Sequence, residues 1–330
     1  MAAFIFRRFL LALATMWAIS VLSFTIIQLP PGDFVDAYIA RLSSTGSSVS
    51  LAEAQGMREL YGLDKPYAVQ YLKWVGRVIK GDFGESMEWQ RPVSEVIGDR
   101  LWITVLISFA ALLVTWGLAL PIGIYSAVRQ YSVGDYVFTF IGFIGLAVPN
   151  FLLALIILYV SFRWFGLNVG GLFSSEYELA PWSLAKVWDL TWHLPLPALI
   201  LALAGTAQLI RIMRANLLDE LRKPYVVTAR AKGLTETRVI LKYPVRAALN
   251  PFASTLAYLF PYLVSGSIIV SLVLSLPTVG PVLLKALIAQ DMYLAGAIVL
   301  LLGLLTVVGT FLSDLALMWI DPRIRHQVDQ

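Results

Sequence analysis

The stretch LWITVLISFAALLVTWGLALPIGIYSA, residues 101–127, contains no aspartate, glutamate, lysine or arginine. A helix needs about 20 consecutive apolar residues to cross the hydrocarbon core of a bilayer, so this run is long enough. Over the whole chain of 330 residues, 58% are hydrophobic and only 14% are charged. Soluble domains carry about a quarter charged residues, so the composition indicates an integral membrane protein.

Six such apolar runs occur along the chain. They are residues 9–28, 101–127, 136–160, 196–210, 252–276 and 293–313. The fourth is short, and we expect it to extend toward Asn216 if Arg211 and Arg214 reach the lipid headgroups. Because backbone groups in lipid must find partners within their own segment, each run is predicted to be a helix. The predicted fold is an all-α integral membrane protein with six transmembrane helices.

The distribution of basic residues predicts the orientation of these helices. Arg7 and Arg8 precede the first run and no A-x-A cleavage pattern follows it, so we interpret this run as a retained helix that starts in the cytoplasm. The inner loop 211–251 holds nine basic residues against three acidic ones, whereas the outer loops 161–195 and 277–292 together hold three against four. Both chain termini are therefore predicted to be cytoplasmic.

The chain lacks the residues that metal binding, nucleotide binding and catalysis require. The chain has no cysteine, and its two histidines, His193 and His326, are far apart, so no metal site is predicted. No GxxxxGK(S/T) sequence is present, and the apolar runs hold no Ser/His or paired-carboxylate constellation. We therefore expect neither an enzyme nor a nucleotide-binding subunit, and no cofactor in this chain.

The long outer segment, residues 29–100, is predicted to contain two short amphipathic helices over the outer mouth of the bundle. In SLAEAQGMRELYG, Ser50 and Glu53 form a capping-box pattern and Gly62 suits a helix end. In the following stretch, Pro66 is placed for a first helical turn. An apolar stripe at helical spacing then runs along this second helix, through Val69, Leu72, Val75 or Gly76, and Ile79.

The basic inner loop has more structure than membrane orientation alone requires. Pro224 can open a helix and Gly233 can end it in a left-handed conformation. Thr235 is a possible N-cap for a second, amphipathic piece of the loop. Pro244 and Pro251 lie on the approach from this piece to the fifth run. A loop that only sets orientation and contacts anionic lipid would need no such arrangement.

Three small residues, Ala229, Ala231 and Gly233, cluster where the two pieces of this loop meet. Small side chains there would let the surface of another protein approach the backbone closely. The arrangement therefore favours a docking element over a purely orienting loop.

The sequence TARAKGLTETRVILKYPVRAALNP, residues 228–251, closely resembles the EAA loop of ABC-importer permeases, in particular those of the dipeptide/oligopeptide (peptide/nickel) family. The resemblance implies a type I ABC importer permease fold in which this loop forms a coupling helix that sits in a cleft of a cytoplasmic ATPase. The positions that it assigns to coupling are Pro224, Tyr225, Thr228, Ala229, Arg230, Ala231, Lys232, Gly233 and Leu234.

Further matches extend the resemblance over nearly the whole chain. Residues 7–33 look like the start of the family's B-type permease, and residues 61–86 resemble its extracytoplasmic signature. The C-terminal third has LSLPTVG, Asp291 and the ending IDPRIR in the family's order. The implied organisation is an N-terminus and first span (1–28), an extracytoplasmic segment (29–100) and a permease core (101–330).

This resemblance implies a transport subunit of the bacterial cytoplasmic membrane that forms half of a pathway for di- or oligopeptides. The implied partners are a second, C-type permease, one or two ATPase subunits that hold the ATP and magnesium, an extracytoplasmic solute-binding protein and membrane lipid, but no nucleic acid. ATP binding would close the ATPases together, and the coupling helix would transmit that closure to the spans, shifting the bundle between inward and outward access.

The chain departs from the family where a glutamate and an aromatic residue are usual after the Gly-Ser pair. Residues 271–274 read Ser-Leu-Val-Leu, and the usual Pro-Gly is Pro277-Thr278. These positions lie late in the fifth run, where they could line the pathway. Oligosaccharides or a nickel complex, which relatives also carry, therefore remain alternative solutes.

The pathway candidates are polar residues inside apolar runs. Asn150 follows Pro149, where a packing kink or a broken pathway helix is expected. Ser267, Ser271 and Ser275 share one face at i, i+4 spacing, which suits either pore lining or close helix packing.

Two further features of the apolar segments have simpler interpretations. Asp314, near the inner end of the last run, is interpreted as structural pairing with a loop arginine rather than as a transport residue. Trp182, Trp188 and Trp192 are expected to anchor the outer interface.

A stand-alone, ion-coupled secondary carrier is the alternative from another class. Such a carrier is expected to hold several buried carboxylates or histidines and often inverted repeats. Only Asp314 is available near the spans, and no convincing repeat relates the two halves. The permease interpretation is therefore preferred.

Overall fold

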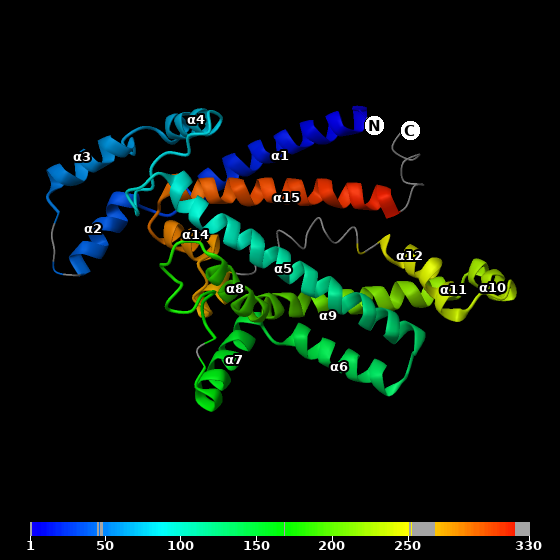
Figure 1. Ribbon diagram of the computed structural model, residues 1–330. Coiled ribbons are helices and arrows are strands. Elements are labelled where there is room, and N and C mark those ends of the chain that lie inside the picture. Colours follow the sequence, from blue (N-terminus) through cyan, green and yellow to red (C-terminus); the bar gives the residue numbers. More distant parts are fainter. Residues whose placement is uncertain are drawn as a thin grey trace. The chain divides into compact units, whose positions relative to one another are not determined.

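A computed structural model describes residues 2–44, 46, 49–167, 169–250, 252 and 268–320. Within these ranges every regular element is a helix (Figure 1), and the only strand-like pairing is an isolated bridge between Glu85 and Pro92. The helices are α1 (Ala2–Gln28), α2 (Phe34–Ser44), α3 (Leu51–Tyr61), α4 (Tyr67–Val78), α5 (Val93–Val128), α6 (Val133–Ala147), α7 (Asn150–Phe165), α8 (Leu184–His193), α9 (Pro195–Leu221), α10 (Pro224–Ala231), α11 (Glu236–Lys242), α12 (Pro244–Ala248), α14 (Val279–Ile288) and α15 (Met292–Ile320).

Four helical stretches among the described residues are long and apolar enough to cross a membrane. They are Arg8–Gln28, Val93–Val128, Leu184–Leu221 and Met292–Leu315. They correspond to the first, second, fourth and sixth predicted runs, and the fourth is much longer than the predicted 196–210. The fifth predicted run, 252–276, lies mostly outside the described residues. The all-helical prediction is therefore confirmed for the described part of the chain.

The third predicted run, 136–160, is not one continuous helix. It divides into α6 and α7, which meet at 102° across the break at Val148 and Pro149. Val148 is extended, as is usual for a residue before proline, and Pro149 lacks the N–H that would continue the ladder. A kink or break at Pro149 was expected within this run, and the structure has a break there. The pair is either one broken span or a re-entrant segment.

Close packing divides the chain into two units. The first comprises residues 1–104 and 278–305, and the second comprises residues 105–277 and 306–330. In the second unit α6 runs antiparallel to α9: Asp135 at the start of α6 contacts Arg214, and Gly145 near its end approaches the Leu203 carbonyl. The glycine lets the two backbones come close, as is common between membrane helices.

The two amphipathic helices of the outer segment form as predicted. The Ser50 hydroxyl accepts from the Glu53 amide and the Glu53 carboxylate accepts from the Ser50 amide, so both halves of the capping box are present. Gly62 ends α3 with φ of 70°. Pro66 immediately precedes the first residue of α4. These local signals were sufficient to place both helices.

The apolar stripe of α4, by contrast, does not face a protein core. Leu72 and Ile79 are 68% and 80% exposed, while Trp74 is 1% exposed and Gln70 is also buried. The residues of α4 that are buried are therefore not those of the stripe. The side that is buried is chosen by long-range neighbours on α1 and α15, which local periodicity does not report.

Trp74 is the centre of this packing in the first unit. Its ring lies 6.0 Å from that of Phe24 on α1 and fills the space above Gly296 on α15. A Cβ at position 296 would lie 2.7 Å from the indole ring. Glycine is therefore required at this position by the tryptophan rather than by the backbone conformation.

We predict that Gly296→Ala destabilises the protein by about 1–3 kcal/mol, because the added methyl group overpacks the contact with Trp74. Gly56→Ala is the matched control, since it lies inside α3 with nothing within 4 Å of a new Cβ. The control should stabilise by about 0.5–1 kcal/mol through helix propensity. Thermal unfolding of both variants in one detergent measures the difference, and equal midpoints would contradict the packing argument.

Candidate coupling surface and solute pathway

The segment after α9 folds into a small unit of three helices, α10 to α12, shown in yellow in Figure 1. Pro224 opens α10 and Gly233 ends it with φ of 74°, so both predicted boundary signals are confirmed. Thr235 precedes α11 in extended conformation, but its side chain makes no capping bond. Pro244 opens α12, which packs back against α9. The unit is therefore tied to the long helix α9, which it follows in the chain.

Three buried side chains hold α10 against α11. Val226, Ala229 and Val239 form an apolar core, with Leu234 and Tyr243 packed at its edge. The other face of α10 is open: Val227 is 60% exposed, although it is apolar. An exposed apolar face on a short, otherwise well-packed helix is suited to contact with another protein.

An ion pair closes the turn between the two helices. Arg230 Nε donates to Glu236 at 3.0 Å and Arg230 Nη2 donates to the other carboxylate oxygen at 2.6 Å. The guanidinium lowers the pKa of Glu236, mainly through this hydrogen bond. Tyr225 donates to Glu220 at the start of the unit. Arg230 is therefore occupied within the unit, so its first role is to fix the angle between α10 and α11.

The predicted coupling residues fall into two groups. Ala229 is buried in the core of the unit and is not open to a partner, contrary to the expectation that it lies on a docking surface. Leu234 is half-buried at its edge. The others are exposed and lie on α10 or on the turn that follows it: Pro224, Tyr225, Thr228, Arg230, Ala231, Lys232 and Gly233.

The pathway candidate Asn150 lies at the bend between α6 and α7. It lines a recess of about 230 Å³ together with Leu146, Ala204 of α9 and Val270. Among the described residues that line it, Asn150 supplies the one polar side chain.

The serine stripe is not continuous. Residues 268–273 are helical, but Ser275 has φ of 55°, and the Leu276 amide donates back to the Ser271 carbonyl. Ser275 thus ends the helix in a left-handed conformation and does not share a face with Ser271. Ser271 is fully buried and its hydroxyl has no hydrogen-bond partner within the described part of the chain. Ser267 lies outside the described residues.

The remaining expectations concern the ends of the apolar segments. Asp314 is half-buried on α15. Trp182, Trp188 and Trp192 are all more than half exposed, and the rings of Trp188 and Trp192 meet edge to face at 6.3 Å. Exposed indoles on and beside α8 suit an interfacial position.

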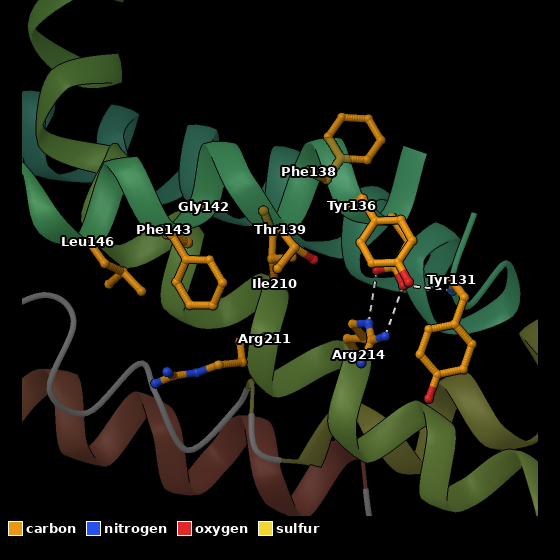
Figure 2. A pocket seen from close by; sticks show the side chains of 12 residues that line it. Tyr131, Tyr136, Phe138, Thr139, Gly142, Phe143, Leu146, Ile210, Arg211 and Arg214 are labelled. Atoms are coloured by element: carbon orange, nitrogen blue, oxygen red, sulfur yellow. Dashed lines mark hydrogen bonds and ion pairs between the residues drawn. The ribbon is translucent and has the colours of Figure 1, made fainter. Parts of the chain in front are cut away.

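A buried ion pair between α6 and α9 was not predicted from the sequence. The Arg214 guanidinium donates to both carboxylate oxygens of Asp135, at 3.0 Å and 2.9 Å, and the Tyr131 amide donates to the same carboxylate at 3.0 Å (Figure 2). The Asp135 side chain is only 3% exposed. The sequence placed Asp135 at the edge of a loop, so nothing in it indicated a partner 79 residues away.

A second buried carboxylate, Asp291, lies between α14 and α15 in the first unit. One oxygen accepts from the Ser86 hydroxyl at 2.6 Å and the Glu88 amide at 3.1 Å, and the other accepts from the Leu294 amide at 3.1 Å. Burial raises the pKa of Asp291, and these donors act in the opposite direction. The carboxylate joins the outer segment to the start of α15, where the helix dipole also favours a negative charge.

Arg211, three residues before Arg214, has a different environment. It lines a groove of about 290 Å³ between α6 and α9, together with Gly142, Phe143 and Leu146. It has no ion pair with an acidic residue within the ranges that the structure describes. Figure 2 shows its side chain directed away from Arg214. The helix itself continues past Asn216 to Leu221, as expected for the fourth run.

Long apolar helices with a charge pair between two of them, joined to a compact helical unit, define a multi-pass membrane protein. The chain belongs to the family described as binding-protein-dependent transport system inner membrane component. The model of that family matches residues 119–326, and the model of its N-terminal part matches residues 1–108. Members of this family are permease subunits.

Relatives match over almost their whole length. An oligopeptide transport system permease protein, AppB, of Bacillus subtilis (strain 168) is 36% identical over 330 residues, covering 99% of this chain and all of that protein. A putative peptide permease protein of Brucella ovis is 35% identical, covering 98% and 99% of the two chains. The inner membrane ABC transporter permease protein YejB of Escherichia coli O157:H7 is 31% identical, with the same coverage.

We predict that Arg214→Met destabilises the protein by about 3 kcal/mol, because it leaves the buried Asp135 carboxylate without its charged partner. Arg222→Met removes an exposed arginine from the end of the same helix and should have little effect. Thermal unfolding in detergent compares the two, and Arg214→Met combined with Asp135→Leu should recover much of the loss. No recovery in the double variant would contradict a pairwise explanation.

We predict that Asp291→Asn weakens the joint between the outer segment and α15 by about 2 kcal/mol, because an amide nitrogen would face the hydrogen-bond donors. Hydrogen exchange at the Glu88 and Trp89 amides should accelerate, while exchange within α10 stays unchanged. The control is Asp64→Asn, which alters an exposed carboxylate and should leave both regions as they are. Unchanged exchange at Glu88 in the Asp291 variant would exclude this role.

Proposed function

We propose that this chain is a permease subunit of an ATP-driven importer for peptides and forms half of the solute pathway. The supporting observation is that a transport-family permease carries a compact helical unit, α10 to α12, with an open apolar face at the end of α9. Two of the relatives named above are described as an oligopeptide transport system permease and a putative peptide permease, and they match over almost the full chain.

In this proposal the chain crosses the bacterial cytoplasmic membrane six times with both termini inside. The fifth crossing is the run 252–276, and the third is the broken pair α6 and α7. The excess of basic residues in 211–251 then lies on the cytoplasmic side, as the positive-inside rule requires. Exposed tryptophans of the α8 region lie at the outer interface.

The proposed partners are those that the permease family implies. This chain has no nucleotide-binding motif, so one or two separate ATPase subunits supply ATP hydrolysis with magnesium. A second permease of C-type provides the other half of the pathway, and an extracytoplasmic binding protein delivers the solute. The exposed coupling residues of α10 and its following turn dock into the ATPase, while Ala229 acts indirectly by supporting the shape of the unit.

Docking can be tested at a position that leaves the fold of the unit intact. Ala231→Trp adds a large side chain to the exposed end of α10, where the backbone is helical. This position is preferable to Gly233, because a tryptophan there would be strained by the positive φ. We predict that Ala231→Trp inserts normally but loses most of the co-purifying ATPase and of ATP-driven peptide uptake.

The matched control for this experiment is Thr237→Trp, which adds the same bulk to an exposed position on α11. It should retain the ATPase, because α11 lies outside the proposed contact. Full retention of ATPase and uptake in Ala231→Trp would contradict the docking surface. Recovery of the wild-type chain without any ATPase, in a form that still transports, would contradict the proposed importer.

A further inference from the structure

Helix α4 has three distinct sides, and only one of them packs against the rest of the first unit. The side of Trp74 is buried against α1 and α15. Leu72 and Ile79 lie on a second side, which is apolar and open. Lys73 and Lys80 lie on a third side, which is basic and exposed. The two members of each pair are seven positions apart, or about two helical turns, so each pair shares a side.

The contacts that α4 makes with α1 lie at membrane depth. The hydroxyls of Tyr71 and Ser20 form a hydrogen bond of 2.8 Å, and the rings of Tyr71 and Phe24 meet at 5.4 Å. Both α1 residues belong to the apolar span Arg8–Gln28. Since a helix rises 1.5 Å per residue, Ser20 lies about 12 Å before the end of this span. The hydrocarbon core is about 30 Å thick, so α4 is attached beside its edge and not in the water beyond it.

The opposite side of α1 has no protein neighbour at this level. Leu22 and Ile26, which face away from Ser20 and Phe24 on the helix, are each more than half exposed. Exposed apolar side chains on a membrane span are in contact with acyl chains, so lipid is present at the depth where α4 is attached. A soluble partner approaches through water and does not reach this depth. Lipid is therefore the occupant that we assign to the open apolar side of α4.

The basic side of α4 matches the headgroups of phospholipids. Lys73 and Lys80 form no ion pair with another residue in the described part of the chain, whereas Arg77 is paired with Asp82 at 2.8 Å. A helix in the membrane interface buries its apolar side about 5–10 Å into the boundary of headgroups and acyl chains. Lysines beside that side can extend their ammonium groups to the phosphates. A purely apolar protein surface would leave these two charges without partners.

We propose that α4 is an interfacial membrane helix: Leu72 and Ile79 insert among acyl chains, and Lys73 and Lys80 bind the phosphate groups of anionic phospholipid. This inference goes beyond the proposed function, because it does not depend on the solute. With the proposed orientation of α1, the leaflet is the outer one. Because Trp74 fixes α4 to α1 and α15, the lipid contact would hold the outer segment against the membrane surface.

The absence of cysteine from the chain allows single-cysteine variants that each carry one fluorescent label. The full chain, with any subunits that co-purify, is placed in nanodiscs that contain phospholipid with a nitroxide near the headgroup. The label at Leu72→Cys should be quenched by this lipid within about two-fold of the label at Leu22→Cys, and should be shielded from iodide in the water. Glu59→Cys, at an exposed position of α3, is the aqueous reference and should be quenched by iodide alone. Ile79→Cys repeats the measurement if Leu72→Cys does not fold.

The headgroup preference is measured with the same label at Leu72→Cys. The nitroxide is carried by phosphatidylglycerol or by phosphatidylcholine at equal mole fraction, and the ratio of the two quenching efficiencies reports local enrichment of the anionic lipid. Each basic residue near a membrane surface favours anionic lipid by about five-fold. The ratio should therefore exceed one, and should fall toward one when Lys73→Gln and Lys80→Gln are combined. Arg222→Gln removes an exposed arginine that follows α9 and should leave the ratio unchanged.

The other outcomes overturn the inference in distinguishable ways. Quenching by iodide but not by lipid, at both Leu72→Cys and Ile79→Cys, would show that this side faces water. Shielding from both quenchers would show that a protein covers it, and exposure on removal of the second permease would identify that protein. A ratio of one with both lysines present would overturn the phosphate contacts. Loss of peptide transport leaves all of these signals unaffected, so a failure of the proposed function and a failure of this inference are separate results.

Discussion

The structure depends on one constraint: in lipid, every backbone hydrogen-bonding group must be satisfied within its own segment. The long helices α1, α5, α9 and α15 meet it by continuing the ladder over the whole apolar run. The segment with a proline in its middle, α6 and α7, breaks at Pro149, and the chain turns by 102° there. Irregular backbone at membrane depth is tolerated where protein or a cavity surrounds it, and Asn150 does line a recess. The break is therefore as informative about the pathway as any side chain.

Buried charged side chains also need partners, and the described residues supply them in two ways. Asp135 and Arg214 neutralise each other in a bidentate pair, and Asp291 is surrounded by hydrogen-bond donors. These groups hold helices together and need nothing further. Arg211 lies three residues from Arg214 on the same helix but is exposed and has no acidic partner in the described ranges, so what faces each arginine decides its pairing.

Features that depend on neighbouring residues could be predicted from the sequence. The capping box at Ser50, the glycine ends at Gly62 and Gly233, and the proline start at Pro224 involve only a few consecutive positions. Features that depend on distant residues could not. The spacing of apolar residues identified a stripe on α4, yet α1 and α15 bury the opposite, Trp74 side of that helix. The serine stripe assumed that the helix continues to Ser275, where a left-handed residue ends it. The sequence also gave no indication that Asp135 faces Arg214, since that contact needs the antiparallel pairing of α6 with α9.

The proposed docking surface is attached to one long helix, and this attachment has a mechanical consequence. α9 runs from Pro195 to Leu221 without a break and is followed within three residues by α10. α12 packs against the same helix, so the unit of α10 to α12 is attached to α9 at two points. A force applied to the exposed face of α10 therefore moves the C-terminal end of α9 rather than bending a loop. In the proposed importer, closure of the ATPases would displace α9 relative to the bend at Pro149, and would change the shape of the recess that Ala204 and Asn150 line.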